Sequence, residues 1–275
     1  MCRWVAYAGP AIFLEDLLFN QEHSLVQQSF AAREARWTTN ADGFGVAWYG
    51  RRDAPGVFKD ILPAWNDANL RAIASHIESD LFFAHVRSST GTSVARSNCH
   101  PFSYRNWTFM HNGQIGGWTI CRKDVESLIS REHYVHRIGS TDSEALFLAA
   151  LSNGLTDEPI AAMTRTIVQV IEIMQAHAID EPLRLSAACT DGTSIWAFRY
   201  SSDDQSPSLY YGTPQLHAER LPGGAVSTIA SEPSDSDSGR WHRIGERTGL
   251  KWSRGSVTHF DIEVPVTRAL SPLHA

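Results

Sequence analysis

The second residue of the chain, Cys2, is the first candidate for covalent chemistry. If Met1 is removed, Cys2 carries a thiol nucleophile and an α-amine on the same Cα atom. A thiol pKa near 8.5 and an α-amine pKa of about 7.7 to 8.0 are close enough for the amine, directly or through one water, to accept the thiol proton near neutral pH. A single cysteine is a poor motif, so the other residues must decide whether this chemistry operates.

Two further segments offer groups that acyl transfer needs. Arg87 follows the apolar run 81–86 and opens a loop of hydroxyl residues. Its planar guanidinium can bind a substrate carboxylate through two parallel hydrogen bonds, or it can form a surface ion pair. Asn112 and Gly113 form a dipeptide typical of hairpin turns. They can equally supply a side-chain amide and a backbone N–H that hold the oxyanion of a tetrahedral intermediate on a tight turn.

A helix start contributes a carboxylate. Thr141 and Glu144 fit a capping box ahead of an apolar run, which accounts for both residues. Asp142 is not required by that box. In the first turn of the helix its carboxylate can accept hydrogen bonds from a substrate α-ammonium, although the helix dipole also favours an acid there.

The elements that must position these residues are strands at both ends of the chain and helices between them. Strands are predicted from β-rich runs bounded by Gly, Asp, Asn or Ser at 3–8, 46–49, 81–86, 107–111, 185–190, 195–200 and 225–229. Helical periodicity occurs at 68–78, at 124–129, at 142–151 and after Pro159. This order favours a layered α+β architecture over a doubly wound one. No linker interrupts residues 1–275, which predicts a single domain, and the segment 231–239 is predicted to be a solvated loop.

Composition restricts the classes of function. The 275 residues carry a net charge of −6, which lacks the electrostatic footprint of a protein that binds nucleic acid or an anionic membrane. We therefore predict that the protein acts on a small molecule. The N-terminal residues carry no long apolar stretch of a signal peptide, which predicts a cytoplasmic protein with its four cysteines as reduced thiols. The absence of paired-cysteine and HExxH motifs argues against a metal, and no cofactor is predicted. Dinucleotide-binding, Walker A and GxSxG motifs are also absent.

An ordered set of motifs makes the chain resemble the class II glutamine amidotransferases, which are N-terminal-nucleophile hydrolases. The motifs are Cys2, Asp42-Gly43-Phe44-Gly45, His85-x-Arg87-x-x-Thr90, Asn98-x-His100-Pro101-Phe102, His111-Asn112-Gly113 and Thr141-Asp142-Ser143-Glu144. The match is with the short, stand-alone branch, which includes the amidohydrolase of ergothioneine biosynthesis. The motifs cover residues 2 to 144, and beyond them only the fold is carried over, with Ser231-Glu232-Pro233 similar to a late strand end of the family.

The resemblance implies a four-layer αββα sandwich of the N-terminal-nucleophile hydrolase type, with Cys2 opening a central strand. It assigns catalysis to Cys2, Asn112 and Gly113, and substrate binding to Arg87, Asp142, Thr90 and His100. Cys2 would attack the γ-amide of glutamine, Arg87 would bind the α-carboxylate and Asp142 the α-ammonium. In the longer synthase relatives a Trp and a His stand where this chain has Ser88 and Gly91, so the resemblance does not extend to the contacts of the closing loop or to the size of the leaving group.

Three functions follow as alternatives. The chain is a glutaminase or amidohydrolase acting on glutamine or on a γ-glutamyl conjugate, an ammonia-supplying subunit of a separate synthase, or a catalytically silent binding module with the same fold. A stand-alone hydrolase is slightly favoured, because one αββα domain accounts for the 275 residues and leaves no fused synthase. The expected partner is a glutamine-like small molecule, with no nucleic acid and no membrane. A separate synthase or a second copy of the chain stays open as a protein partner.

Overall fold

The computed structural model describes residues 2–34, 39–89, 91–215, 225–237 and 239–264. Strands in these ranges form two antiparallel sheets. The seven-stranded sheet has the order β11-β9-β10-β1-β4-β2-β3, with β1 (Arg3–Phe13), β2 (Phe44–Trp48), β3 (Gly56–Asp60), β4 (Glu78–Val86), β9 (Tyr210–Gly212), β10 (Thr228–Ala230) and β11 (Trp241–Arg243). The six-stranded sheet has the order β13-β12-β8-β7-β6-β5, with β5 (Phe102–Tyr104), β6 (Trp107–Gln114), β7 (Arg184–Thr190), β8 (Ile195–Ser201), β12 (Thr248–Ser253) and β13 (Ser256–Asp261).

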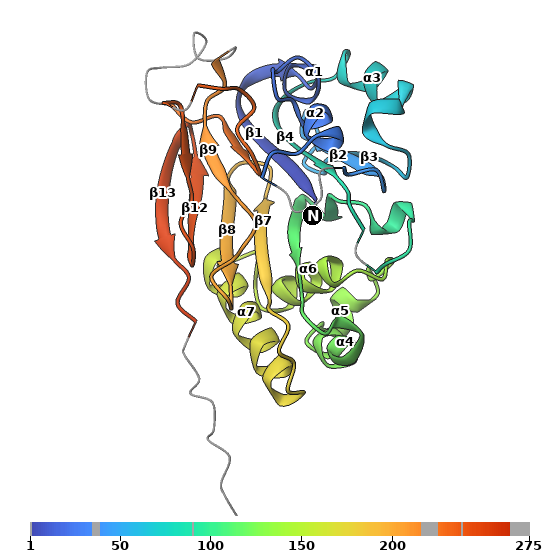
Figure 1. The fold of residues 1–275 in the computed structure, drawn as a ribbon, viewed down its shortest axis with the longest axis vertical. Helices are drawn as coiled ribbons and strands as arrows, with labels where there is room; N and C mark the ends of the chain where they lie inside the picture. Colours follow the sequence, from blue (N-terminus) through green and yellow to red (C-terminus); the bar gives the residue numbers. More distant parts are fainter. Residues whose placement is uncertain (1, 35–38, 90, 216–224, 238, 265–275) are drawn as a thin grey trace, which may run out of the picture.

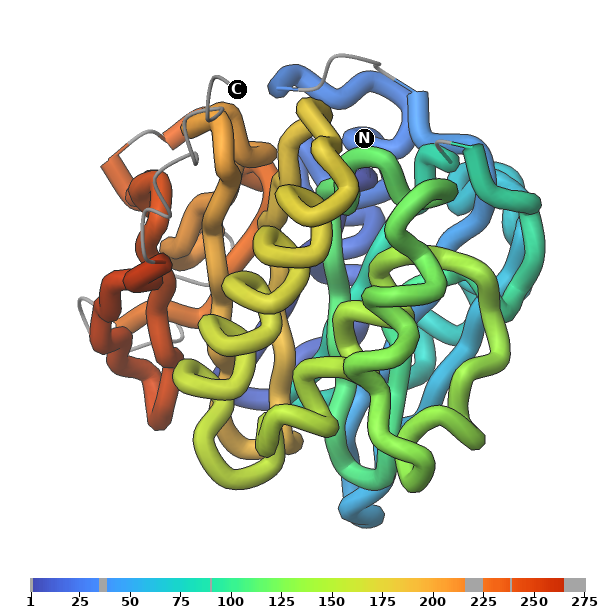
Figure 2. The backbone as a smooth tube through the Cα atoms, turned by 90° about the horizontal axis from the view of Figure 1, so that it is seen from below, coloured from blue at the N-terminus to red at the C-terminus, as the bar shows by residue number. Residues whose placement is uncertain are grey.

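Helices lie at two sides of the molecule (Figure 1). One group is α1 (Glu15–Leu18), α2 (Leu25–Phe30), α3 (Ala68–Ala74) and the 3₁₀ turn η1 (Ala64–Asn66). The other is α4 (Trp118–Ser127), α5 (Arg131–Tyr134), α6 (Asp142–Ser152) and α7 (Pro159–Ala176), with a further 3₁₀ turn, η2 (Arg96–Asn98), before β5. Helices α6 and α7 pack side by side, and α6 also packs on β6 (Figure 2). None of the helices described is long and apolar enough to cross a membrane.

Alternation along the strands produces the layers. In β1, Val5 and Tyr7 belong to a core cluster shared with the first group of helices, whereas Trp4 and Ala6 belong to a second cluster between the two sheets. Strand β7 behaves in the same way, because its Leu185 packs toward the second group of helices. Successive side chains of a strand point to opposite faces, so the central strands of each sheet are buried on both sides. The predicted four-layer αββα sandwich is confirmed.

Two predicted helices differ in extent from the observed ones. The helix predicted at 68–78 ends at Ala74, and the chain has already entered β4 at Glu78. The helix predicted at 124–129 begins earlier, at Trp118, after Gly117 in a left-handed conformation. Amphipathic periodicity locates such helices but does not fix their ends, which depend on local capping groups.

The predicted solvated loop at 231–239 is wrong at its first residues. Glu232 is only 1% exposed. Its carboxylate accepts hydrogen bonds from Arg3 Nε at 2.6 Å, from His23 Nε2 at 2.7 Å and from the backbone N–H groups of Arg33 and Glu34, each at 2.9 Å. Burial raises the pKa of Glu232, but His23, Arg3 and the two N–H groups outweigh it and lower that pKa to about 2. The polar composition of this segment predicts an exposed loop, whereas its Glu232 is buried and forms ion pairs with Arg3 and His23.

Candidate active site

Cys2 immediately precedes β1, the fourth of the seven strands in its sheet. Hydrogen bonds to β4 on one side and β10 on the other fix this strand. The carbonyl oxygen of Cys2 accepts a hydrogen bond from Arg3 Nη1 at 2.8 Å, so the buried Arg3–Glu232 pair also holds this residue. The N-terminal end of a rigid central strand thus positions the candidate nucleophile.

The Cys2 thiol contacts backbone rather than side chains. Its Sγ atom lies 3.6 Å from the carbonyl oxygen of Ser88 and accepts from the Ser88 N–H at 3.5 Å. In the described part of the chain no imidazole or carboxylate makes a hydrogen bond to this sulfur. Burial raises the pKa of Cys2, which the Ser88 N–H and the Arg87 charge only partly oppose. A thiol in this setting needs a base other than a neighbouring side chain.

Arg87 directly follows β4, as the sequence predicted. The backbone fixes it, because its N–H donates to Gly43 at 2.8 Å and its carbonyl accepts from the Asp42 N–H at 3.0 Å. The guanidinium donates to Thr92 Oγ1 at 2.7 Å and to the Ser93 carbonyl at 3.2 Å, and the residue is 3% exposed. No carboxylate within the described ranges pairs with it. A buried cation with only neutral partners favours an anionic ligand.

Asp142 occupies the first turn of α6, behind the predicted cap Thr141, whose hydroxyl accepts from the Glu144 N–H at 3.2 Å. The Asp142 carboxylate accepts from the N–H groups of Ile115 at 2.9 Å and Ser143 at 2.8 Å. The other half of the predicted capping box differs, because the Glu144 carboxylate accepts from Gly139 N–H at 2.8 Å. Asp142 is thus oriented by α6 itself and by the residue that follows β6.

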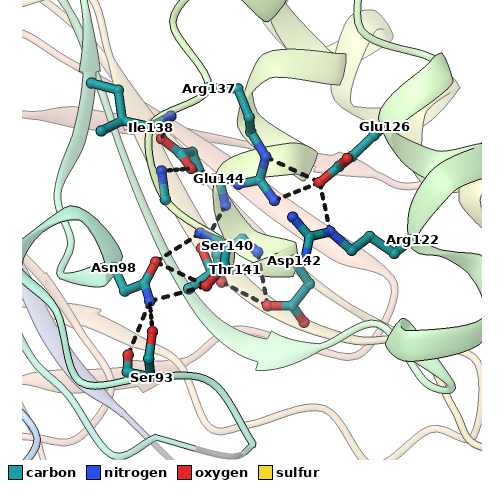
Figure 3. A network of polar contacts seen from close by, with 12 residues as sticks. Ser93, Asn98, Arg122, Glu126, Arg137, Ile138, Ser140, Thr141, Asp142 and Glu144 are labelled. Atoms are coloured by element: carbon teal, nitrogen blue, oxygen red, sulfur yellow. Dashed lines mark hydrogen bonds and ion pairs between the residues drawn. The ribbon is translucent and has the colours of Figure 1, made fainter.

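A polar network ties the loop around Arg87 to the start of α6 (Figure 3). The Asn98 amide donates to the Ser93 carbonyl at 2.9 Å and accepts from the Ser140 N–H at 2.8 Å. Ser93 is a partner of Arg87, and Ser140 lies two residues before Asp142. Asn98 therefore fixes the positive and negative groups of the site relative to each other.

Asn112 and Gly113 lie within β6, paired with Ser186 and Leu185 of β7, and not in the hairpin turn that the dipeptide suggested. Asn112 is 1% exposed, and neither its Nδ2 nor its Oδ1 has a hydrogen-bond partner within the described residues. Buried amides without partners are rare in native proteins, so this one indicates a ligand atom. A Cβ at position 113 would overlap the Arg184 carbonyl oxygen of β7, which is why glycine is required there.

Three buried histidines, His85, His100 and His111, lie in or beside the site. His85 and His100 stack with ring centroids 4.2 Å apart, and His111 Nδ1 lies 2.8 Å from Ser143 Oγ. Burial lowers the pKa of His85 to about 3 and that of His100 well below its usual range, so both rings are neutral at neutral pH. Neither nitrogen of His100 has a partner in the described structure.

One pocket of about 240 Å³ brings the predicted site residues together. Its lining includes Cys2, Arg87, His100, Asn112, Gly113 and Asp142. Thr90, the remaining predicted site residue, lies outside the described residues. The described chain contains no cluster of three or more His, Cys, Asp or Glu side chains arranged to hold a metal ion. The pocket thus offers a thiol, hydrogen-bond donors and charges of both signs.

Gln114 and Arg184 are among the residues of this pocket that sequence reasoning missed. They are cross-strand partners at the ends of β6 and β7. Alternation along β6 would have found Gln114, because it lies two residues beyond Asn112 and therefore on the same face. Arg184 belongs to no motif. Its place in the pocket can be found only from the register in which β6 pairs with β7.

Comparison with solved structures defines the class of fold. A glutamine aminotransferase class-II domain protein from Silicibacter pomeroyi superimposes with a TM-score of 0.74 at 38% identity, over 96% of this chain and 100% of that one. The glutamine phosphoribosylpyrophosphate amidotransferase of B. subtilis superimposes with a TM-score of 0.63 over 96% of this chain and 50% of that one, and at 14% identity it shows the fold alone. The fold is that of the N-terminal-nucleophile type of glutamine amidotransferase.

Sequence comparison defines the family. The model of the class-II glutamine amidotransferases matches residues 17–211. A probable glutamine amidotransferase of Saccharomyces cerevisiae, DUG3, is 37% identical over 284 residues, which cover 89% of this chain and 79% of that protein. The gamma-glutamyl-hercynylcysteine sulfoxide hydrolase of Mycolicibacterium smegmatis is 28% identical, covering 90% of this chain and 93% of that protein. The chain belongs to the class II glutamine amidotransferase family and is an enzyme of this kind.

Proposed function

We propose that this enzyme hydrolyses the γ-amide bond of glutamine or of a γ-glutamyl conjugate through a thioester on Cys2. The observation that carries the proposal is the content of one pocket. It holds the Cys2 thiol, the unpartnered Asn112 amide and the Arg87 guanidinium, which no acid neutralises within the described residues. Each of these groups lacks the partner that a γ-glutamyl substrate would bring.

The first half of the reaction forms the thioester. After removal of Met1, the α-amine of Cys2 accepts the thiol proton, and the sulfur attacks the γ-carbonyl carbon. The carbonyl electron pair moves to oxygen, where the Asn112 amide and the Gly113 N–H stabilise the negative charge. The C–N bond then breaks, and the leaving amine takes the proton from the α-ammonium of Cys2. The γ-glutamyl group remains bound to sulfur.

The second half returns the enzyme to its starting state. Water enters the position that the amine has left, and the α-amine of Cys2 accepts its proton as the oxygen attacks the thioester carbon. The same donors hold the second oxyanion. The C–S bond breaks, the sulfur recovers its proton, and glutamate is released.

Recognition of the γ-glutamyl end uses the two charged residues. Arg87 binds the α-carboxylate and Asp142 the α-ammonium, while the neutral ring of His100 lines the pocket beside them. A relative named for the hydrolysis of a γ-glutamyl conjugate and another named as a probable glutamine amidotransferase support both substrates.

Intact mass measured before and after incubation with 6-diazo-5-oxo-norleucine tests this proposal. We expect purified protein to lack Met1 and to gain one label, and the Cys2→Ala variant to gain none. Cys121→Ala is the matched control, because Cys121 is fully buried outside the pocket, and it should still be labelled. Processed protein that takes up no label, and hydrolyses no γ-glutamyl amide, would contradict the proposal and favour a binding module.

A further inference from the structure

A second arginine lines the pocket from the other sheet. Arg184 opens β7, where it pairs with Gln114, while Ser186 pairs with Asn112. Further along the same face, Ala188 lies in the core cluster between the sheets. Because alternate residues of a strand share a face, the Arg184 side chain lies on the pocket side of β7. Arg87 instead follows β4 of the seven-stranded sheet, so each sheet contributes one arginine.

The two arginines differ in what surrounds them. Arg87 is buried, whereas the Arg184 side chain is 28% exposed and lies at the rim. Arg184 Nε donates to Asp203 at 3.2 Å, and Nη2 donates to Asp203 and Gln205. Within the described chain Nη1 has no partner. An ion pair of this exposure contributes little to stability.

The position of Arg184 along the pocket indicates what it meets. Its carbonyl oxygen lies against Gly113, one of the two proposed oxyanion donors. The scissile bond must lie beside those donors, and the group leaving from it extends past them. In the proposed function, Arg87 and Asp142 already account for both charges of the γ-glutamyl end. Arg184 is then the cation on the leaving-group side.

We propose that Arg184 binds a carboxylate of the leaving group, so that the preferred substrates are γ-glutamyl amino acids or γ-glutamyl peptides and not glutamine itself. This inference rests on the proposed function and specifies its substrate class. Asp203 holds the guanidinium from one side, and Nη1 donates to the substrate carboxylate. Gln114, beside it on β6, supplies a side-chain amide to the same part of the substrate.

A pair of substrates that differ only in the relevant charge tests the inference. γ-Glutamylglycine and γ-glutamylglycinamide carry a carboxylate and a carboxamide at the same position. We expect the wild-type kcat/KM to favour the carboxylate by about 10- to 100-fold, the range for a charge-assisted hydrogen bond. In Arg184→Gln this preference should fall to about threefold or less, and Arg184→Lys should restore part of it. Arg247→Gln, which breaks a similar ion pair with Asp204 outside the pocket, should keep the full preference.

Different experimental outcomes would contradict the role of Arg184 and the proposed function. Equal kcat/KM for both substrates in active wild-type enzyme would overturn the role of Arg184 alone. An Arg184→Gln variant with unchanged melting temperature and unchanged preference would do the same. Wild-type enzyme that hydrolyses neither substrate, nor glutamine, would overturn the proposed function and this inference with it.

Discussion

The Asn112 side chain lowers the stability of the folded protein. A buried polar group without a hydrogen bond destabilises a protein by about 1–3 kcal/mol, and this side chain has two such atoms in the described structure. Stability and the proposed function therefore place opposite demands on this side chain, as is common for groups that form their hydrogen bonds only in a transition state. Truncation should separate the two demands.

We expect Asn112→Ala to lower kcat by about 10²- to 10³-fold, the usual effect of losing one oxyanion donor. The free energy of unfolding should not fall and should rise by about 1 kcal/mol or more, because the substitution removes two buried polar atoms that have no hydrogen-bond partner in the described structure. Steady-state kinetics and urea unfolding measure the two effects. Asn66→Ala, at an exposed position, is the control and should alter neither. Retention of kcat within about threefold would remove Asn112 from the mechanism.

Asp142 permits a test that changes the substrate as well as the enzyme. Asp142→Asn removes the charge proposed to bind the α-ammonium, so KM for glutamine should rise about tenfold or more. Glutaramate, which is glutamine without the α-amine, should have a low kcat/KM with the wild type. The Asp142→Asn substitution should not lower that kcat/KM further. Comparing kcat/KM for the two substrates in both proteins gives the coupling. Equal losses for both would show that Asp142 acts only through α6.

At the scale of the elements, β6 and β7 pack so closely at Gly113 that there is no space for a side chain. A Cβ there would overlap the Arg184 carbonyl oxygen of the neighbouring strand and His111 Nε2. The strands must separate to admit it, and this would also displace Asn112 and Arg184.

Gly113→Ala should therefore destabilise the protein by about 1–3 kcal/mol or more, as overpacking does in rigid cores. It should also abolish most activity. Gly50→Ala is the matched control, because a Cβ there meets no atom within 4 Å, and its melting temperature should be unchanged. A Gly113→Ala variant as stable as wild type would show that β6 and β7 can separate without cost.

The sequence predicted the elements and the site unequally. Ordered motifs indicated Cys2, Arg87 and Asp142, and short-range rules placed Arg87 after its strand and Thr141 at its cap. The same rules failed for Asn112, because a dipeptide typical of turns lies inside a strand, where packing against β7 decides. Arg184 carries no local signal, since only the pairing of β6 with β7 brings it to the pocket.

For the whole molecule, Glu232 connects parts of the chain that are far apart in sequence. It binds Arg3 at the start of β1, His23 before α2 and the backbone at Arg33 and Glu34. Such a junction cannot be predicted from composition, because its partners lie about two hundred residues away. Through Arg3 it also reaches the carbonyl group of Cys2.

Glu232→Gln should cost about 3–5 kcal/mol of stability at neutral pH, since it leaves the buried Arg3 without its counter-charge. The pKa of Glu232 is about 2 in the fold and 4.5 ordinarily. Its contribution is therefore complete above about pH 4.5 and is lost as the pH falls toward 2. Urea unfolding across this range should show a steeper acid loss for wild type than for the variant. Glu22→Gln, at a surface ion pair, should match wild type, and parallel acid profiles for Glu232→Gln would contradict this account.

The placement of Cys2 at the head of a central strand also restricts how the chain can be joined to other polypeptides. If the proposed mechanism operates, a polypeptide attached ahead of Cys2, which lines the pocket, would convert the α-amine into an amide that cannot act as a base. A leader that is cut to leave Cys2 first would restore the chemistry, whereas a permanent fusion there would block both substrate and proton transfer. Affinity tags and fusion partners for this enzyme therefore belong at the other terminus.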